Sequence, residues 1–161
     1  MLSFLRRGGT GSEMVIRARD GQPLARIPAS VREQVRYLWT RLQVHGGAIP
    51  PSIGVTSQLS GEGVSFTSQA LAAVLARTGD TCLLEANWWS PGLPVEDDGG
   101  GLAGLLTQSA PVADVLVETS HPGLWILPAG QLTDPGQAVM ANTESMRSIL
   151  GVLHQRFNHV I

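Results

Sequence analysis

Residues 53–66 read IGVTSQLSGEGVSF, and this stretch decides the expected fold. Its first four residues, Ile53 to Thr56, form an apolar run that predicts a short buried strand. The loop from Ser57 to Gly63 follows, and a helical pattern extends from about Val64 to Arg77. The order strand, glycine loop, helix is the context in which many proteins bind phosphate through backbone N–H groups.

The sequence before this stretch predicts one further helix and little else. An alternating run at Met14–Ala18, with a turn at Asp20-Gly21, predicts at most one hairpin inside a flexible leader over residues 1–29. Ser30 is the expected N-cap of a helix over residues 31–44, where apolar side chains recur at helical spacing.

Downstream segments alternate between strands and helices. The expected strands are Thr81–Leu84 and Leu124–Leu127, and the expected helices are Leu102–Thr107, Val112–Val117 and a longer one from about Met146 to Arg156. This alternation predicts an α/β fold over residues 30–161, with a parallel sheet and helices on both faces. A fourth strand only opens at Val160-Ile161. We therefore expect a sheet that is truncated or completed by a partner.

Composition excludes several classes of function. The chain has 161 residues, 43% of them apolar, and a net charge of −2 without a basic block, so nucleic acid is not an expected partner. One cysteine excludes an internal disulfide and a cysteine-based zinc site, and the four histidines lack metal-ligand spacing, so no metal is expected. No apolar run approaches the roughly 20 residues of a membrane span, which favours a cytoplasmic protein.

All 11 basic residues are arginines, which bears directly on the glycine loop. A phosphate-binding loop uses glycines to expose backbone N–H groups, a lysine to reach the outer phosphates, and Ser or Thr to hold magnesium. Here Gly61, Glu62 and Gly63 form the loop and Ser65 keeps the hydroxyl, but Val64 stands in the place of lysine. The fragment is equally compatible with a tight strand-to-helix turn that binds no ligand.

Several segments in the same order resemble the bacterial tyrosine kinases of capsule and exopolysaccharide systems, P-loop proteins related to the ParA and MinD ATPases. The resemblance covers roughly residues 30–161. Its segments are SGEGVSF at Ser60–Phe66 for PGEGKST, EANWWSP at Glu85–Pro91 for DADLRRP, the helix pair over Leu102–Val117, GLWILPAG at Gly123–Gly130 for a strand ending LPAG, and Met146–Ile161 for a helix leading into YDYVII.

The resemblance implies a P-loop fold whose nucleotide site has lost residues that catalysis needs. The corresponding positions are Gly61, Glu62, Gly63, Val64, Ser65, Glu85 and Asn87. Glu85 and Asn87 replace two aspartates, and the family's third nucleotide motif would fall after Ile161. We therefore expect no catalytic residue and no cofactor, and at most weak binding of ATP with magnesium.

An alternative is a weak ATPase of the ParA/MinD type, or a kinase-related nucleotide-binding protein, in which an arginine such as Arg77 replaces the lysine. Tyr37 is the sole tyrosine, so the family's tyrosine-rich tail is also missing.

The resemblance also implies binding to other proteins. Glu33 and Arg36 match the first two positions of the family's E-x-x-R-x-x-R oligomer contact, and Trp39 replaces the last arginine. Trp88 and Trp89 either meet a partner or fill the altered nucleotide pocket. We expect a noncatalytic regulator or scaffold in exopolysaccharide biosynthesis and export. Its implied partner is a membrane polysaccharide copolymerase or related export component, which recruits it to the inner face of the membrane, where it also forms a homo-oligomer.

Overall fold

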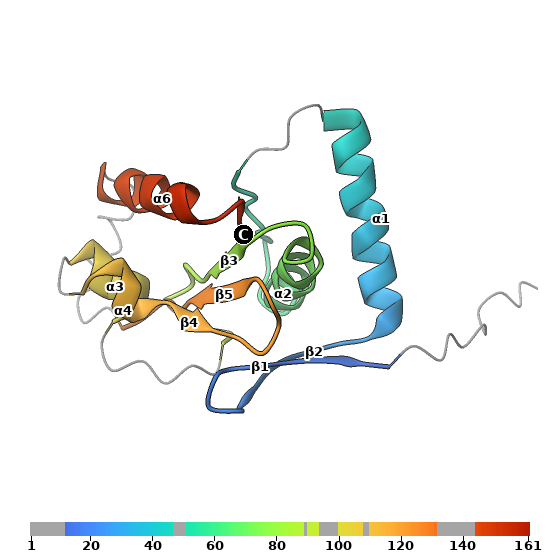
Figure 1. Cartoon of the computed structure of the whole chain (residues 1–161), viewed down its shortest axis with the longest axis horizontal. Coiled ribbons are helices and arrows are strands. Elements are labelled where there is room, and N and C mark those ends of the chain that lie inside the picture. Colours follow the sequence, from blue (N-terminus) through green and yellow to red (C-terminus); the bar gives the residue numbers. More distant parts are fainter. Residues whose placement is uncertain (1–11, 47–50, 89, 94–99, 108–109, 132–143) are drawn as a thin grey trace, which may run out of the picture.

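The computed structural model describes residues 12–46, 51–88, 90–93, 100–107, 110–131 and 144–161. Figure 1 shows the arrangement of the helices and strands. In chain order they are β1 (Met14–Arg17), β2 (Pro23–Ile27), α1 (Ala29–Gly46), α2 (Val64–Leu75), β3 (Thr81–Leu84), α3 (Gly101–Leu106), α4 (Val112–Val115), β4 (Val117–Glu118), β5 (Leu124–Leu127), α6 (Glu144–Arg156) and β6 (His159–Val160).

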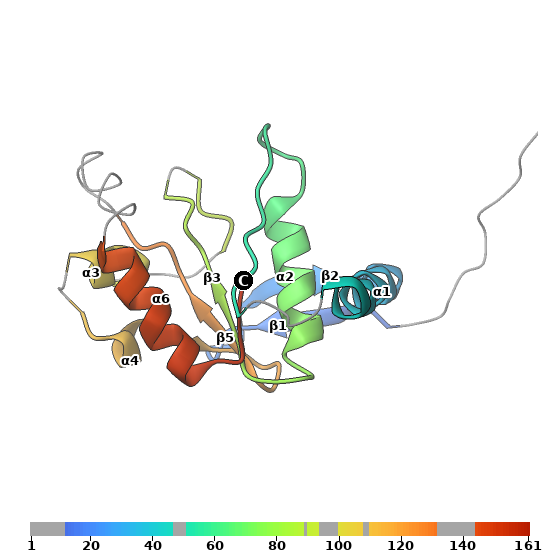
Figure 2. The same ribbon diagram turned by 90° about the horizontal axis from the view of Figure 1, so that it is seen from above.

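The main sheet has the strand order β4-β5-β3-β6. Strand β3 pairs in parallel with both β5 and β6, as the alternation of strands and helices predicts. Strand β4 differs, because it runs antiparallel to β5 at the edge of the sheet. Helices α1 and α2 lie on one side of the sheet and helices α3, α4 and α6 on the other, which Figure 2 shows from above. The expected α/β fold with both faces covered is confirmed.

Each face of the sheet has its own apolar core. Helix α2 buries the alanine-rich run Ala70–Ala73 together with Leu75, and these small side chains let it lie close to the strands. Helix α1 packs on α2 from outside through Val35 and Trp39, which lie four residues apart on one face. The opposite core joins α3 and α6 to Cys82, whose burial raises its pKa to about 12.

The predicted strand at Ile53–Thr56 is wrong. The chain touches the sheet there only through an isolated bridge between Ser52 and Val160. The Ile53 N–H donates to the Val160 carbonyl at 2.9 Å, and the Val160 N–H donates to the Pro51 carbonyl at 2.9 Å. Pairing goes no further because β6 is only two residues long.

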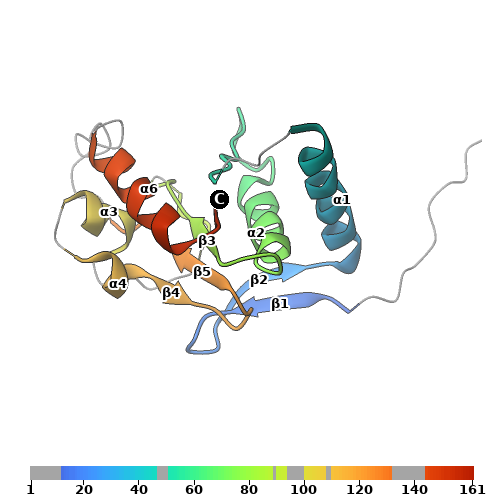
Figure 3. The same cartoon turned by 45° about the horizontal axis from the view of Figure 1, so that its top comes forward.

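The hairpin β1–β2 is part of the packed structure, in contrast to the flexible leader expected over residues 1–29. Its apolar residues Ile16, Leu24 and Ile27 are buried in the core beneath α2, and Figure 3 shows the hairpin extending below α1 and α2. The Ser120 N–H donates to the Arg17 carbonyl at 2.8 Å, which ties the hairpin to the segment after β4. Residues 1–11 lie outside the described part of the chain.

Two predicted helix boundaries also shift. Helix α1 begins at Ala29, so Ser30 lies inside it, and the N–H groups of Val31 and Arg32 donate to the Pro28 carbonyl. Helix α4 ends at Val115 rather than Val117, because Val117 pairs with β5. In the part of the chain that the structure describes, no helix has the length and apolar character needed to span a bilayer.

Candidate functional site

The glycine loop precedes α2, as the sequence predicts. Gly61 and Gly63 both have φ of 86°, a left-handed conformation that favours glycine, and a Cβ at either would meet nothing within 4 Å. The carboxylate of Glu62 accepts the N–H of Leu59 at 3.2 Å and closes the loop. The Thr67 N–H donates to the Gly63 carbonyl at 2.8 Å, so the first helical turn follows directly.

The first turn of α2 carries the hydroxyls of Ser65 and Thr67 but no charge. Val64 is half-buried at the position where the resemblance implies a lysine, and Ser65 is exposed beside it. The alternative of Arg77 as a substitute cation is wrong. Arg77 lies beyond the opposite end of α2, a helix of 12 residues that spans roughly 18 Å at 1.5 Å per residue.

Glu85 turns its carboxylate toward the chain's own loop. Its Oε1 accepts the N–H groups of Gly92 and, at 3.3 Å, of Leu93. Burial raises the pKa of Glu85, and the backbone N–H groups of Gly92, Leu93 and Ala129 partly offset that rise. The oxygen that the resemblance assigns to a metal site is therefore already hydrogen-bonded within the protein.

Gly92 lies close to both Ser65 and Glu85. A Cβ added at Gly92 would come within 2.5 Å of the Ser65 Oγ and 3.5 Å of the Glu85 Oε1. Gly92 thus contacts the two side chains that would have to reach a magnesium ion together. Sequence reasoning missed Gly92, whose only signal was its place in a loop with Pro91.

Asn87 and Trp88 hold the same loop in place. The Asn87 amide donates to the Ser90 carbonyl at 2.8 Å and accepts the Ser90 N–H at 3.3 Å, a side-chain closure of a tight turn. Trp88 is half-buried, packs against the α3–α6 core and donates its Nε1–H to the Ala129 carbonyl at 2.8 Å. Trp89 lies outside the described residues.

The proposed oligomer contact divides into exposed and buried residues. Glu33 and Arg36 are exposed on α1, and their contact with a partner stays a prediction. Trp39 is 4% exposed and meets the His159 ring edge-on at 5.4 Å between centroids. Its side chain therefore belongs to the core between α1 and the sheet and is not available to a partner in this conformation.

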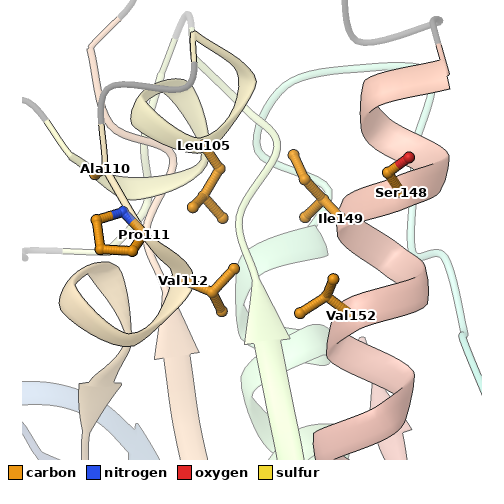
Figure 4. A pocket seen from close by; sticks show the side chains of 7 residues that line it. All are labelled: Leu105, Ala110, Pro111, Val112, Ser148, Ile149 and Val152. Carbon is orange, nitrogen blue, oxygen red and sulfur yellow. The ribbon is translucent and has the colours of Figure 1, made fainter.

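An apolar groove of about 460 Å³ lies between α6 and the α3–α4 pair. Figure 4 shows Ile149 and Val152 of α6 facing Leu105 of α3 and Val112 of α4. None of its lining residues is ionisable, so the groove offers no group for acid–base or metal chemistry. Elsewhere in the described residues, no cluster of three or more His, Cys, Asp or Glu could hold a metal ion.

No family model matches the chain. The chain is similar to tyrosine-protein kinase CpsD of Streptococcus agalactiae, with 28% identity over 114 residues. The match covers 68% of this chain and 49% of CpsD, so the chain spans about half the length of the curated relatives it matches.

Solved kinase domains share the fold. The kinase domain of Escherichia coli tyrosine kinase ETK matches with a TM-score of 0.72 and 22% identity, covering 81% of this chain and 52% of that one. The BceF tyrosine kinase domain matches with a TM-score of 0.69 and 26% identity, covering 80% and 53%. The VpsO kinase domain matches with a TM-score of 0.71 and 21% identity, covering 82% and 66%.

Proposed function

Because the chain is a relative of the bacterial tyrosine kinases of capsule and exopolysaccharide systems, we propose that it is a noncatalytic regulator or scaffold in exopolysaccharide biosynthesis and export. The observation that carries this proposal is the contact of Gly92 with both Ser65 and Glu85. A magnesium ion needs oxygen ligands that are free to converge on it. Here one carboxylate oxygen accepts two backbone N–H groups instead.

The residues present do not fit an ATP–magnesium group well. Val64 supplies no positive charge, and a charge-assisted hydrogen bond contributes about 1.5–3 kcal/mol, so its loss weakens binding roughly ten- to a hundredfold. Removal of one preorganised donor from a transition state lowers rate by about 10²–10³. Binding of nucleotide can survive such losses more easily than phosphoryl transfer does.

Helix α1 supports a role in protein binding. It exposes the apolar side chains of Tyr37, Leu38 and Leu42 close in sequence to Glu33 and Arg36. Exposed apolar groups that are flanked by charge are typical of a protein contact surface. We place the protein in the cytoplasm, at the inner face of the membrane, in contact with a polysaccharide copolymerase or related export component and with other copies of itself.

Calorimetric titration with ATP and magnesium tests the loss of nucleotide function. We expect weak binding or none, and no autophosphorylation in either the natural sequence or Val64→Lys, because Glu85 and Asn87 would still replace aspartates. Low-micromolar affinity, or kinase activity restored by Val64→Lys alone, would contradict the proposal.

A weak ATPase is the alternative that the loop itself favours, since Gly61 and Gly63 keep the left-handed conformation and Ser65 begins the helix. Phosphate release separates the two functions. ATP hydrolysis that survives repeated purification, and that disappears in the double variant Ser65→Ala with Glu85→Ala, would support the ATPase and contradict the noncatalytic scaffold.

Co-purification with the cytoplasmic segment of a copolymerase tests the partner. We expect Glu33→Ala with Arg36→Ala to weaken capture, with Arg147→Ala on α6 as the control. Trp88→Ala is expected to lower the melting temperature, because the indole is half-buried and hydrogen-bonded to Ala129. Unchanged capture by the folded α1 variant would remove the proposed contact.

A further inference from the structure

A cavity of about 400 Å³ lies between α1 and the last turn of α2, and we call it the arginine cavity. Three of its lining residues are arginines, Arg32, Arg36 and Arg77, and the lining also includes Glu33 and Trp39. Its volume is within the range of small-molecule sites, which hold ligands in roughly 300–1,000 Å³. It lies at the end of α2 opposite the glycine loop.

Helical spacing explains why these side chains converge. Arg32, Arg36 and Trp39 are separated by four and three residues, which places them on one face of α1. That face packs on α2, and the two helices lie side by side in Figures 1 and 3. Arg77 follows the end of α2 and completes the cavity from the other side.

Two residues that line this cavity, Arg32 and Trp39, each have a buried donor that lacks an acceptor. The Nε of Arg32 and the Nε1 of Trp39 are buried without a hydrogen-bond partner among the described residues. Trp39 is 4% exposed, and Arg32 is fixed by donation from Nη2 to the Ser12 carbonyl at 2.8 Å. Guanidinium and indole nitrogens can only donate, so these two atoms stay unsatisfied in this conformation, in which neither is open to the cavity.

The charge of the lining selects an anion. Three guanidinium groups face one carboxylate, that of Glu33, which leaves an excess of two positive charges. Guanidinium groups match the geometry of phosphate and carboxylate oxygens. A phosphate monoester carries about −1.5 to −2 charges and three acceptor oxygens, which suits this excess of positive charge. The groove of Figure 4 has no comparable group.

We propose that the arginine cavity binds a small phosphate-bearing ligand, either inorganic phosphate or a phosphate monoester. Arg36 of α1 and Arg77 of the turn after α2 contact its charge from two sides, and Arg32 adds a third guanidinium group to the lining. None of the glycine-loop residues takes part in this site, but Glu33 and Arg36 also belong to the partner contact proposed for α1, so Arg77 is the residue that separates phosphate binding from partner binding.

Nuclear magnetic resonance of the indole N–H groups tests the site directly. The Trp39 signal is assigned by its loss in Trp39→Phe, and the protein is titrated with sodium phosphate or glycerol phosphate at constant pH and ionic strength. We expect a saturable shift of the Trp39 signal, with the Trp125 signal unchanged. The ligand that saturates at lower concentration distinguishes inorganic phosphate from a monoester.

Two variants that each remove one positive charge, Arg77→Gln and Arg147→Gln, make this test more specific. Arg77→Gln should weaken phosphate binding about tenfold or more, whereas Arg147→Gln, exposed on α6, should leave it unchanged. Glu33→Gln should tighten binding, because it removes the single like charge. The double variant Ser65→Ala with Glu85→Ala should bind phosphate normally, which separates this site from the glycine loop.

Three results would overturn the proposal. Equal losses in Arg77→Gln and Arg147→Gln would show nonspecific attraction. Tighter binding of acetate or succinate than of phosphate would assign the cavity to carboxylates. A Trp39 signal that no anion shifts would show that the cavity binds none of them.

Discussion

The two ends of helix α2 differ in what they offer to a phosphate group. At its N-terminus the glycine loop keeps its left-handed backbone, yet Val64 brings no charge and Gly92 lies against Ser65. At its C-terminus there is no phosphate motif, yet three arginines line one cavity. The place of a site in the fold therefore does not determine whether it can bind an anion. The charges of the side chains that meet there determine this.

Removal of the indole at the C-terminal end should have the largest effect. Trp39→Ala is expected to lower the free energy of unfolding by about 3–5 kcal/mol, because a buried tryptophan would leave a cavity in the core. Trp39→Phe should cost less, since it keeps an aromatic ring and removes an unpaired donor. Urea denaturation measures both. A loss below about 1 kcal/mol for Trp39→Ala would show that this end is not packed as described.

At the N-terminal end, Glu85→Ala should lower the free energy of unfolding by about 1–3 kcal/mol, because it strips an acceptor from the Gly92 and Leu93 N–H groups. Glu85→Gln keeps a carbonyl oxygen there and removes a charge that burial disfavours, so its stability at neutral pH should equal or exceed that of the natural sequence. Thermal melts of the pair distinguish an internal acceptor from a metal ligand. Equal losses in both variants would contradict this role.

A double-mutant cycle tests how closely the 90–93 segment covers Ser65. Gly92→Ala should lower the free energy of unfolding by about 1 kcal/mol, because its new Cβ meets the Ser65 Oγ. The same change in a Ser65→Ala background should cost less, since the nearest atom is gone. Additive effects in denaturant titrations would mean that the segment does not lie on Ser65.

The smallest effects concern pH, and the two ends of α2 should respond in opposite directions. The folded pKa of Glu85 is raised above its ordinary 4.5 by burial, so stability falls as pH rises from about 4.5 through that folded value. The folded pKa of His159, beside Trp39, is lowered below 6.5 by burial, so stability falls as pH drops from about 6.5 through its folded value.

Stability curves against pH for Glu85→Gln and His159→Gln should each lose one of these slopes. A curve that keeps both slopes in either variant would show that another group titrates there.

Much of the fold could be predicted because it depends on neighbours in sequence. Apolar spacing predicts α1, α2 and α6, and short apolar runs predict β3 and β5. The same reasoning failed at Ile53–Thr56, which forms no strand, and only the preceding Ser52 forms a bridge to Val160. It also failed at β4, whose two residues carry no usable period. Pairing of a strand depends on the backbone available beside it, which local sequence does not contain.

The sequence by itself determined which chemical groups each end of α2 can use. The absence of lysine, the valine at position 64 and the glutamate at position 85 are visible without any structure. Only the tertiary structure decided where those groups point. In the folded chain the Glu85 carboxylate accepts the Gly92 N–H. Arg77 lines the same cavity as Arg32 and Arg36, although some forty residues separate them in sequence. Residue types are local properties, whereas convergence of distant side chains depends on how helices pack over a sheet.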